Sequence, residues 1–279
     1  MGIKIVADSC CDITPELKEN MNVTIVPLTI RVGEKEFIDD ETLSIGELLE
    51  NMKASADAPK TSCPSPKDFM KAYEGKEDSV FVVTLSSNLS GTYNSAVLAK
   101  DMLSEGTEKK FVHVFDSLSA CIGETMISMK IFELAKINLS NMQIVEKVNN
   151  YIKDMKTFFL LESLDNLIKA GRVNKLKGVL ASLLNIKPIM GAEVDGTIKL
   201  VESVRGSKQA FKRFVEVVGE QGEKLEEKII GIAHCNCRER AEKFKEELLK
   251  RYRFKDIIII EMAGISTVYA NDGGLVVAF

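Results

Sequence analysis

Residues 80–102 read VFVVTLSSNLSGTYNSAVLAKDM, and this stretch decides the fold class. Residues 80–84 form an apolar, β-branched run, which is typical of a buried strand. A helical pattern follows from Ser90 to Met102, after a turn that is rich in hydroxyl groups. In that turn Ser90 can cap the helix, and Gly91 allows the backbone to approach a ligand closely. A buried strand that leads directly into a helix predicts an α/β fold with a parallel sheet.

The same alternation of strand and helix runs through the whole first half of the chain. Further strands are predicted at residues 4–7, 22–27, 28–32 and 111–115. Helices are predicted at residues 44–53, 120–135 and 142–155. A further short helix follows Thr14 and Pro15, which suit the N-cap and the first helical position. This order favours a mostly parallel, Rossmann-like sheet with helices on both faces.

The second half is predicted to be a mixed α/β unit. Strands are predicted at residues 157–161, 228–233, 256–262 and 274–279, and helices at residues 175–184, 207–218 and 238–252. Asp195-Gly196 is a favourable hairpin turn between strands at 188–194 and 197–201. We place the boundary near residue 155, which gives an N-terminal domain at 1–155 and a C-terminal domain at 156–279.

The composition is that of a folded protein of two domains. The 279 residues are enough for about two domains of roughly 150 residues, and 45% of them are hydrophobic. The formal charge is −4, whereas a nucleic-acid-binding surface needs a basic face. The N-terminus has no signal-peptide pattern, and the six cysteines lack the spacing of a secreted disulfide framework. We therefore expect a cytoplasmic protein that binds no nucleic acid.

Two histidines, His113 and His234, limit the catalytic devices that the chain can build. His234 follows a strand-like run and precedes a helix, which is where open α/β sheets place ligands. A structural role for His234 is an equal alternative. The run His234-Cys235-Asn236-Cys237 resembles a metal cluster. The two cysteines of a structural zinc pair, however, usually have two to four residues between them, and here there is one. We predict no metal site.

Two segments concentrate small hydroxyl groups in predicted turns. They are Thr61-Ser62-Cys63-Pro64-Ser65-Pro66 and Leu85-Ser86-Ser87-Asn88-Leu89-Ser90-Gly91-Thr92-Tyr93. Free N–H groups and a helix dipole beside such turns favour a small anion. The chain lacks the glycine-rich phosphate-binding motifs of nucleotide sites. A carboxylate therefore fits these hydroxyls better than a phosphate.

Segments in order along the whole chain resemble the DegV family. They are Val6–Thr14, the two hydroxyl-rich segments, Asp116-Ser117, Leu161–Leu167, Ala170–Val173, Ile186–Ile189 and Arg205. The resemblance implies a two-domain fold that holds one long-chain, palmitate-like fatty acid in a tunnel between the domains, without any cofactor. It implies a carrier rather than an enzyme. The implied partner is a bacterial fatty acid kinase, which phosphorylates the carboxyl group for phospholipid synthesis, and a transient contact with a membrane surface would suit this role.

The resemblance also assigns the residues of the site. Carboxylate binding falls on Thr61, Ser62, Ser86, Ser87, Ser90, Gly91 and Thr92, with Ser90 as the chief contact. Arg172, Lys187 and Arg205 match basic positions that contact ligand or partner. Tyr269 stands where many members have a histidine that assists carboxyl phosphorylation, and its phenol can still donate to a carboxylate.

Apolar residues at the start of the second half are predicted to line the tunnel. They are Phe158, Phe159, Leu161, Leu164, Leu167, Ile168, Leu180, Leu183, Leu184, Ile186, Ile189 and Met190. Ordinary core packing is the alternative for each of them.

Two other functions remain open at this point. One is a serine-dependent acyl hydrolase or transferase, in which Ser90 or Ser62 attacks and His234 is the base, although no G-x-S-x-G motif is present. The other is a lipid-responsive regulatory module that acts on a partner through domain closure.

Overall fold

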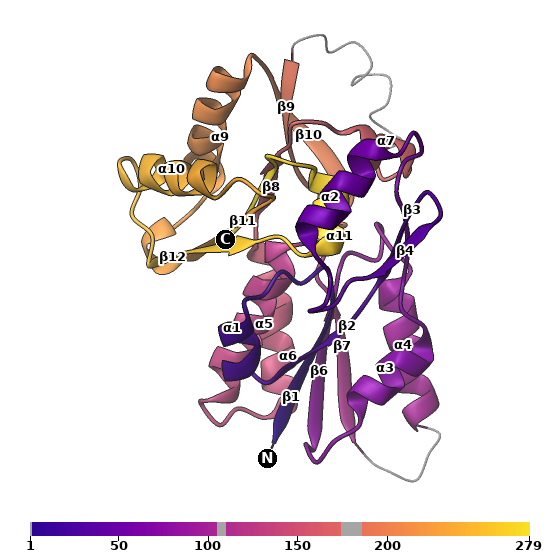
Figure 1. Ribbon diagram of the computed structural model, residues 1–279. Helices are drawn as coiled ribbons and strands as arrows, with labels where there is room; N and C mark the ends of the chain where they lie inside the picture. The colour runs from indigo at the N-terminus through magenta and orange to yellow at the C-terminus, as the bar shows by residue number, and fades with distance from the viewer. Residues whose placement is uncertain (1, 105–109, 174–185) are drawn as a thin grey trace.

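The computed structural model describes residues 2–104, 110–173 and 186–279. Its first and second halves each form a sheet with helices, and Figure 1 shows the first half below the second. The predicted helix at 175–184 lies outside the described residues, as do Leu180, Leu183 and Leu184.

The sheet of the first half is parallel, as predicted. Its strands are β1 (Ile3–Asp8), β2 (Val23–Val26), β6 (Ser79–Thr84) and β7 (Phe111–Asp116). They lie in the order β2-β1-β6-β7, and each neighbouring pair is parallel. The chain thus passes from one side of β1 to the other before it enters β6. In open α/β sheets, the carboxyl ends of strands at such a switch point are where ligands bind.

Helices cover both faces of this sheet, because successive side chains along each strand point to opposite faces. Val80 and Val82 of β6 pack toward α3 (Pro66–Tyr73) and α4 (Thr92–Ser104). The opposite face packs toward α5 (Ile122–Ala135) and α6 (Asn141–Asp154), and Figure 1 shows the two pairs on opposite sides. The short α1 (Pro15–Asn20) is capped by Thr14, as predicted.

Helix α5 is buried because it lies between the two sheets. It contacts β1 and β6 of the first half and also β11 (Ile229–His234) and β13 (Leu275–Ala278) of the second. Its residues from Ile122 to Ser128 are all buried. A Cβ on Gly231 would lie 2.4 Å from Ile122, so the absence of a side chain there allows the helix to approach β11.

The sheet of the second half is mixed, as predicted. Its remaining strands are β8 (Thr157–Leu160), β9 (Ile186–Ala192), β10 (Ile198–Arg205) and β12 (Asp256–Glu261). The order is β10-β9-β8-β13-β11-β12, in which β11 and β12 are parallel and the other neighbours antiparallel. The outer face packs against α9 (Ser207–Gln221) and α10 (Arg238–Leu249), with the turn η2 (Leu225–Glu227) after α9. The predicted hairpin at Asp195-Gly196 is confirmed.

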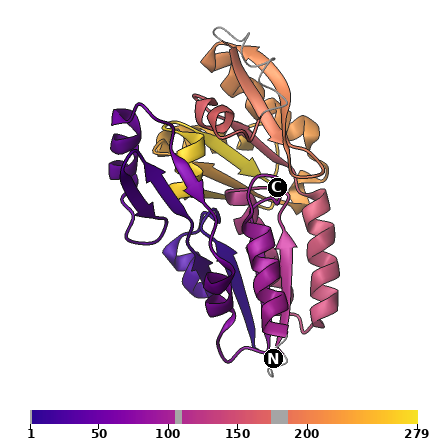
Figure 2. The same cartoon turned by 90° about the vertical axis from the view of Figure 1, so that its right-hand side faces the viewer.

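A third, small sheet was not predicted. It contains β3 (Thr29–Val32), β4 (Lys35–Ile38) and β5 (Lys60–Ser62) in the order β4-β3-β5. Beside it, α2 (Ile45–Ala54) packs on α11 (Gly264–Ala270), which in turn contacts α7 (Asp165–Lys169). Figure 2 shows this layer on one side of the molecule. The strand at 28–32 and the helix at 44–53 were predicted, whereas β4, β5, α7 and α11 were not, because elements of three to seven residues show too few repeats of a periodic pattern.

Three local predictions were wrong. Thr61 and Ser62 lie in strand β5 rather than in a turn, because they pair with β3. Ser65 and Pro66, also assigned to a predicted turn, instead form the start of α3, where Ser65 makes a capping box with Asp68. Helix α4 begins at Thr92, two residues later than predicted, because the carbonyl of Gly91 accepts the first helical hydrogen bond, from Ser95.

Candidate functional site

A cavity lies between the two halves at the switch point of the first sheet. Its empty space amounts to about 780 Å³, which includes space open to solvent. Cys10 and Leu85, from the loops after β1 and β6, form part of its wall. The inner face of the second sheet forms the facing part, with Phe159 and Val276 as cross-strand neighbours. A cavity therefore lies between the two halves, where the resemblance implied a tunnel.

Successive side chains of a strand point to opposite faces of the sheet, and this decides which of the residues predicted to line the tunnel reach this cavity. Phe159, Leu161 and Leu167 line it, and Thr157 to Leu161 span about 13 Å of wall at ~3.3 Å per residue. Phe158 and Ile189 point to the opposite face of the sheet, where they pack against α9, so the prediction for these two residues was wrong. Leu164, Ile168 and Met190 belong to the hydrophobic cluster that surrounds the cavity.

The loop after β6 is joined to the second half by three hydrogen bonds. Ser86 Oγ donates to Gly196 O at 3.0 Å, and Asn88 Nδ2 donates to Asp195 O at 2.7 Å. Arg172 Nε donates to Leu89 O at 3.0 Å. These bonds hold the loop against the cavity. The hydroxyl of Ser86, which is fully buried and also accepts from the amide of Asn88, therefore has a structural function at this junction.

Two hydroxyl pairs adjoin residues of the cavity wall. Tyr269 of one pair lines the cavity, whereas Thr61, Ser90 and Thr92 are not among the lining residues, and Ser90 follows the lining residue Leu89. Thr61 Oγ1 and the Tyr269 phenol are 2.7 Å apart, and Ser90 Oγ and Thr92 Oγ1 are 2.9 Å apart. A Cβ on Gly91 would lie 3.5 Å from Cys63 Sγ, so the two predicted segments are neighbours in space. The structure thus brings together residues that are about thirty positions apart in one half, and adds Tyr269 from the other.

The positively charged side chain of Arg172 lies near Tyr269. The Arg172 guanidinium lies 5.9 Å from the centre of the Tyr269 ring, and both side chains line the cavity. Arg172 also donates to the carbonyl of Ala170 at 2.7 Å, which fixes the guanidinium at this place. An anion at Tyr269 would therefore have hydroxyl donors and a positive charge nearby.

The other predicted site residues lie in different surroundings. Lys187 Nζ donates to Glu162 Oε2 at 2.6 Å and to Glu162 O at 2.9 Å, in an ion pair that also includes Arg240. Ser62 is exposed on β5, Ser87 is half-buried, and Arg205 is exposed at the end of β10.

His234 is buried at the end of β11, and its surroundings do not favour a catalytic base. Its Nδ1 accepts from the Cys237 amide at 3.4 Å, and burial lowers its pKa. Within the described part of the chain, no hydrogen bond joins His234 to a serine, and its Nε2 has no partner. The hydrolase alternative thus lacks the serine–histidine pair that it requires.

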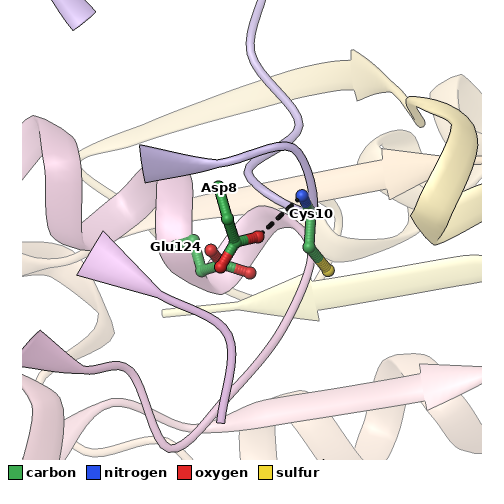
Figure 3. A group of neighbouring side chains, drawn as sticks. All are labelled: Asp8, Cys10 and Glu124. Carbon is green, nitrogen blue, oxygen red and sulfur yellow. Dashed lines mark hydrogen bonds between the residues drawn. The ribbon is translucent and has the colours of Figure 1, made fainter. Parts of the chain in front are cut away.

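A group of buried acids next to the cavity was not predicted from the sequence. Asp8, Cys10 and Glu124 offer ligand-type atoms within 4.8 Å of one another and are buried. Figure 3 shows these three side chains next to one another. Asp8 accepts from the amides of Cys10 at 2.9 Å and Leu85 at 2.8 Å, and so joins two loops of the cavity wall. The signal in the sequence was Glu124, which is the one charged residue between Asp116 and Lys130.

Burial favours the protonated forms of the acids in this group. It raises the pKa of Asp8 to about 7 and raises the pKa of Glu124 well above its usual range. Neither carboxyl oxygen of Glu124 has a hydrogen-bond partner among the described residues. Besides burial, the interaction with Asp8 raises the pKa of Glu124, and the interaction with Glu124 lowers the pKa of Asp8, which favours Glu124 as the acid that keeps its proton.

No helix in the described part of the chain combines the length and the apolar character needed to cross a bilayer.

Comparison with known sequences finds one family along the whole chain. Residues 2–279 match the family model described as uncharacterised protein, DegV family. A DegV domain-containing protein from Streptococcus pneumoniae is 36% identical over 281 residues, covering 100% of this chain and 99% of the relative.

Solved structures with the same fold contain fatty acids. A DegV family protein from Ruminococcus gnavus, refined with vaccenic acid, has a TM-score of 0.96 at 42% identity, covering 99% of both chains. The fatty acid kinase (Fak) B3 protein of Streptococcus pneumoniae, loaded with linoleic acid, has a TM-score of 0.90 at 35% identity, covering 100% of this chain and 99% of that one. Family model, relatives and fold agree with the resemblance found in the sequence: the chain belongs to the DegV family.

Proposed function

We propose that this protein binds one long-chain fatty acid in the cavity between its halves and presents the carboxylate to a fatty acid kinase. The observation that carries the proposal is an apolar cavity whose wall includes Tyr269 and Arg172 beside the Ser90 and Thr61 hydroxyls. The fatty acids in the related structures support it. In this proposal the protein is a carrier with no catalytic activity of its own.

The energetics suit a bound acyl chain. A sixteen-carbon acid has about fourteen methylenes, which at ~0.8 kcal/mol each provide on the order of 11 kcal/mol of transfer free energy. Association and chain ordering cost several kcal/mol of this. The carboxylate cannot be buried without partners, and hydroxyls with one nearby guanidinium supply them.

Mass spectrometry tests the proposal directly. Native and denatured masses of the purified protein should differ by the mass of one fatty acid per chain. Delipidated protein should take up one equivalent of palmitate, and a fatty acid kinase from a bacterium with DegV proteins should then form acyl phosphate from it. Failure to bind any fatty acid would contradict the proposal, and binding without phosphorylation would contradict the kinase-coupled part.

The hydroxyl pairs give a first mutational prediction. Replacing Ser90 and Thr61 together with alanine removes one hydroxyl from each pair, at about 1 kcal/mol per lost hydrogen bond. We expect roughly 30-fold weaker palmitate binding, measured by titration of delipidated protein. A matched double variant that replaces the exposed hydroxyls of Thr42 and Ser104 with alanine should bind as the wild type does. Equal affinity of both double variants would show that the carboxylate lies elsewhere.

A further inference from the structure

The first turn of α11 meets two carboxylates from the other half of the chain. Asp12 Oδ1 accepts from the Ala263 amide at 2.7 Å. Asp39 Oδ1 and Oδ2 accept from the amides of Gly264 at 2.7 Å and Ile265 at 2.9 Å. Three consecutive N–H groups, which have no partner inside a helix, are therefore all satisfied by two aspartates.

These contacts are buried and sterically specific. Asp12 is 0% exposed and Asp39 is 3% exposed, and Gly264 and Ile265 are also buried. A buried N–H that loses its acceptor costs about 1–3 kcal/mol. A Cβ on Gly264 would lie 2.5 Å from Asp39 Oδ1, so a residue without a side chain is needed for the aspartate to reach the helix.

The helix that is held in this way carries part of the cavity wall. Ile265, Ser266, Tyr269 and Ala270 of α11 line the cavity, and Tyr269 reaches Thr61. Near its other end, the carbonyl of Val268 accepts from Asn166 Nδ2 at 2.7 Å. With both ends fixed, the rotation of α11 determines where the phenol of Tyr269 lies.

We propose that Asp12 and Asp39 are positioning residues for the carboxylate end of the ligand: they hold the start of α11 so that Tyr269 stays beside Thr61 and Arg172. This inference rests on the proposed function. Neither aspartate is among the cavity-lining residues, so both act through the helix. Asp12 also accepts from Cys121 Sγ at 2.7 Å, and so links the helix to a second part of the wall.

Two ligands that differ only in the head group can separate a positioning role of the aspartates from a general effect on protein stability. Delipidated protein is titrated with palmitate and with hexadecanol, which share the tail and differ in the head. In Asp39→Asn one of the two acceptors becomes an NH2 group that faces a backbone N–H. We expect palmitate affinity to fall at least tenfold and hexadecanol affinity to change less than twofold. Asp40→Asn is the control, because Asp40 is the half-buried neighbour that bonds to exposed Thr42, and it should leave both affinities unchanged.

Two results would overturn the inference: unchanged palmitate binding in Asp39→Asn, or equal losses for acid and alcohol. If wild-type protein binds neither ligand, the proposed function fails instead. Hydrogen exchange on wild-type protein tests the contact even if the variant does not fold. The amides of residues 263–265 should exchange as slowly as those of the central strands, and exchange at the rate of exposed loops would show that the aspartates do not hold them.

Discussion

Replacing Ala192 with phenylalanine is expected to abolish retention of a fatty acid while leaving the fold intact. Ala192 lines the cavity on β9, opposite Ile198 of β10, which lines it too. The added ring would occupy space needed by about five methylenes, and at ~0.8 kcal/mol each this is about 4 kcal/mol, or nearly 1,000-fold in affinity. Titration of delipidated protein with palmitate measures the loss, and circular dichroism checks the fold.

Val194→Phe is the matched control for this change. Val194 lies two residues further along the same hairpin and is 87% exposed, so an identical ring there points into solvent. It should bind palmitate as the wild type does. If Ala192→Phe retained a full equivalent of fatty acid, the ligand would not occupy this cavity, and the proposed function would lose its main support.

The fold could be predicted where burial alone dictates structure. Apolar runs such as Val80–Thr84 become strands because both faces of a parallel sheet are covered. By contrast, α11 has seven residues, and the bonds that hold its start come from Asp12 and Asp39, more than 220 positions away. No local pattern contains such a bond. The same holds for β5, which is a strand because β3 lies beside it.

The site was predicted in part, and the difference has a physical cause. Hydroxyl-rich segments and the family resemblance pointed to Ser90, Thr61 and Tyr269. Tyr269 lines the cavity and bonds to Thr61, whereas Ser90 only follows the lining residue Leu89. Ser86 belongs to the same segment, yet its hydroxyl already donates to the carbonyl of Gly196 and accepts from the amide of Asn88. A sequence shows which groups can bond but not which partners already occupy them.

The buried acids next to the cavity lead to the largest expected change in stability. Burial raises the pKa of Glu124 in the folded protein well above its ordinary value of 4.5. A group with a raised folded pKa stabilises the fold most at low pH, and this contribution is lost as pH rises toward the folded pKa. While Glu124 remains protonated in the fold, each pH unit above about 4.5 therefore costs about 1.4 kcal/mol.

Glu124→Gln removes this cost, because glutamine is neutral at every pH and its amide, like a carboxylic acid, is able to donate a hydrogen bond. We expect the variant to match the wild type near pH 4.5 and then to exceed its free energy of unfolding by a margin that grows with pH for as long as Glu124 stays protonated in the fold. Urea unfolding of delipidated protein between pH 5 and pH 8 measures this difference.

Glu146→Gln is the control for this substitution, since Glu146 is exposed on α6 and should give a difference near zero at every pH. A Glu124→Gln variant that is less stable than wild type, or whose advantage does not grow with pH, would mean that Glu124 is ionised in the fold. It would then need a cation to neutralise it, and a proton held by Glu124 beside Asp8 would be excluded. A stability gain that grows with pH would instead show that Glu124 keeps its proton in the fold at a cost in stability. This proton lies near Asp8, which bonds to two loops of the cavity wall.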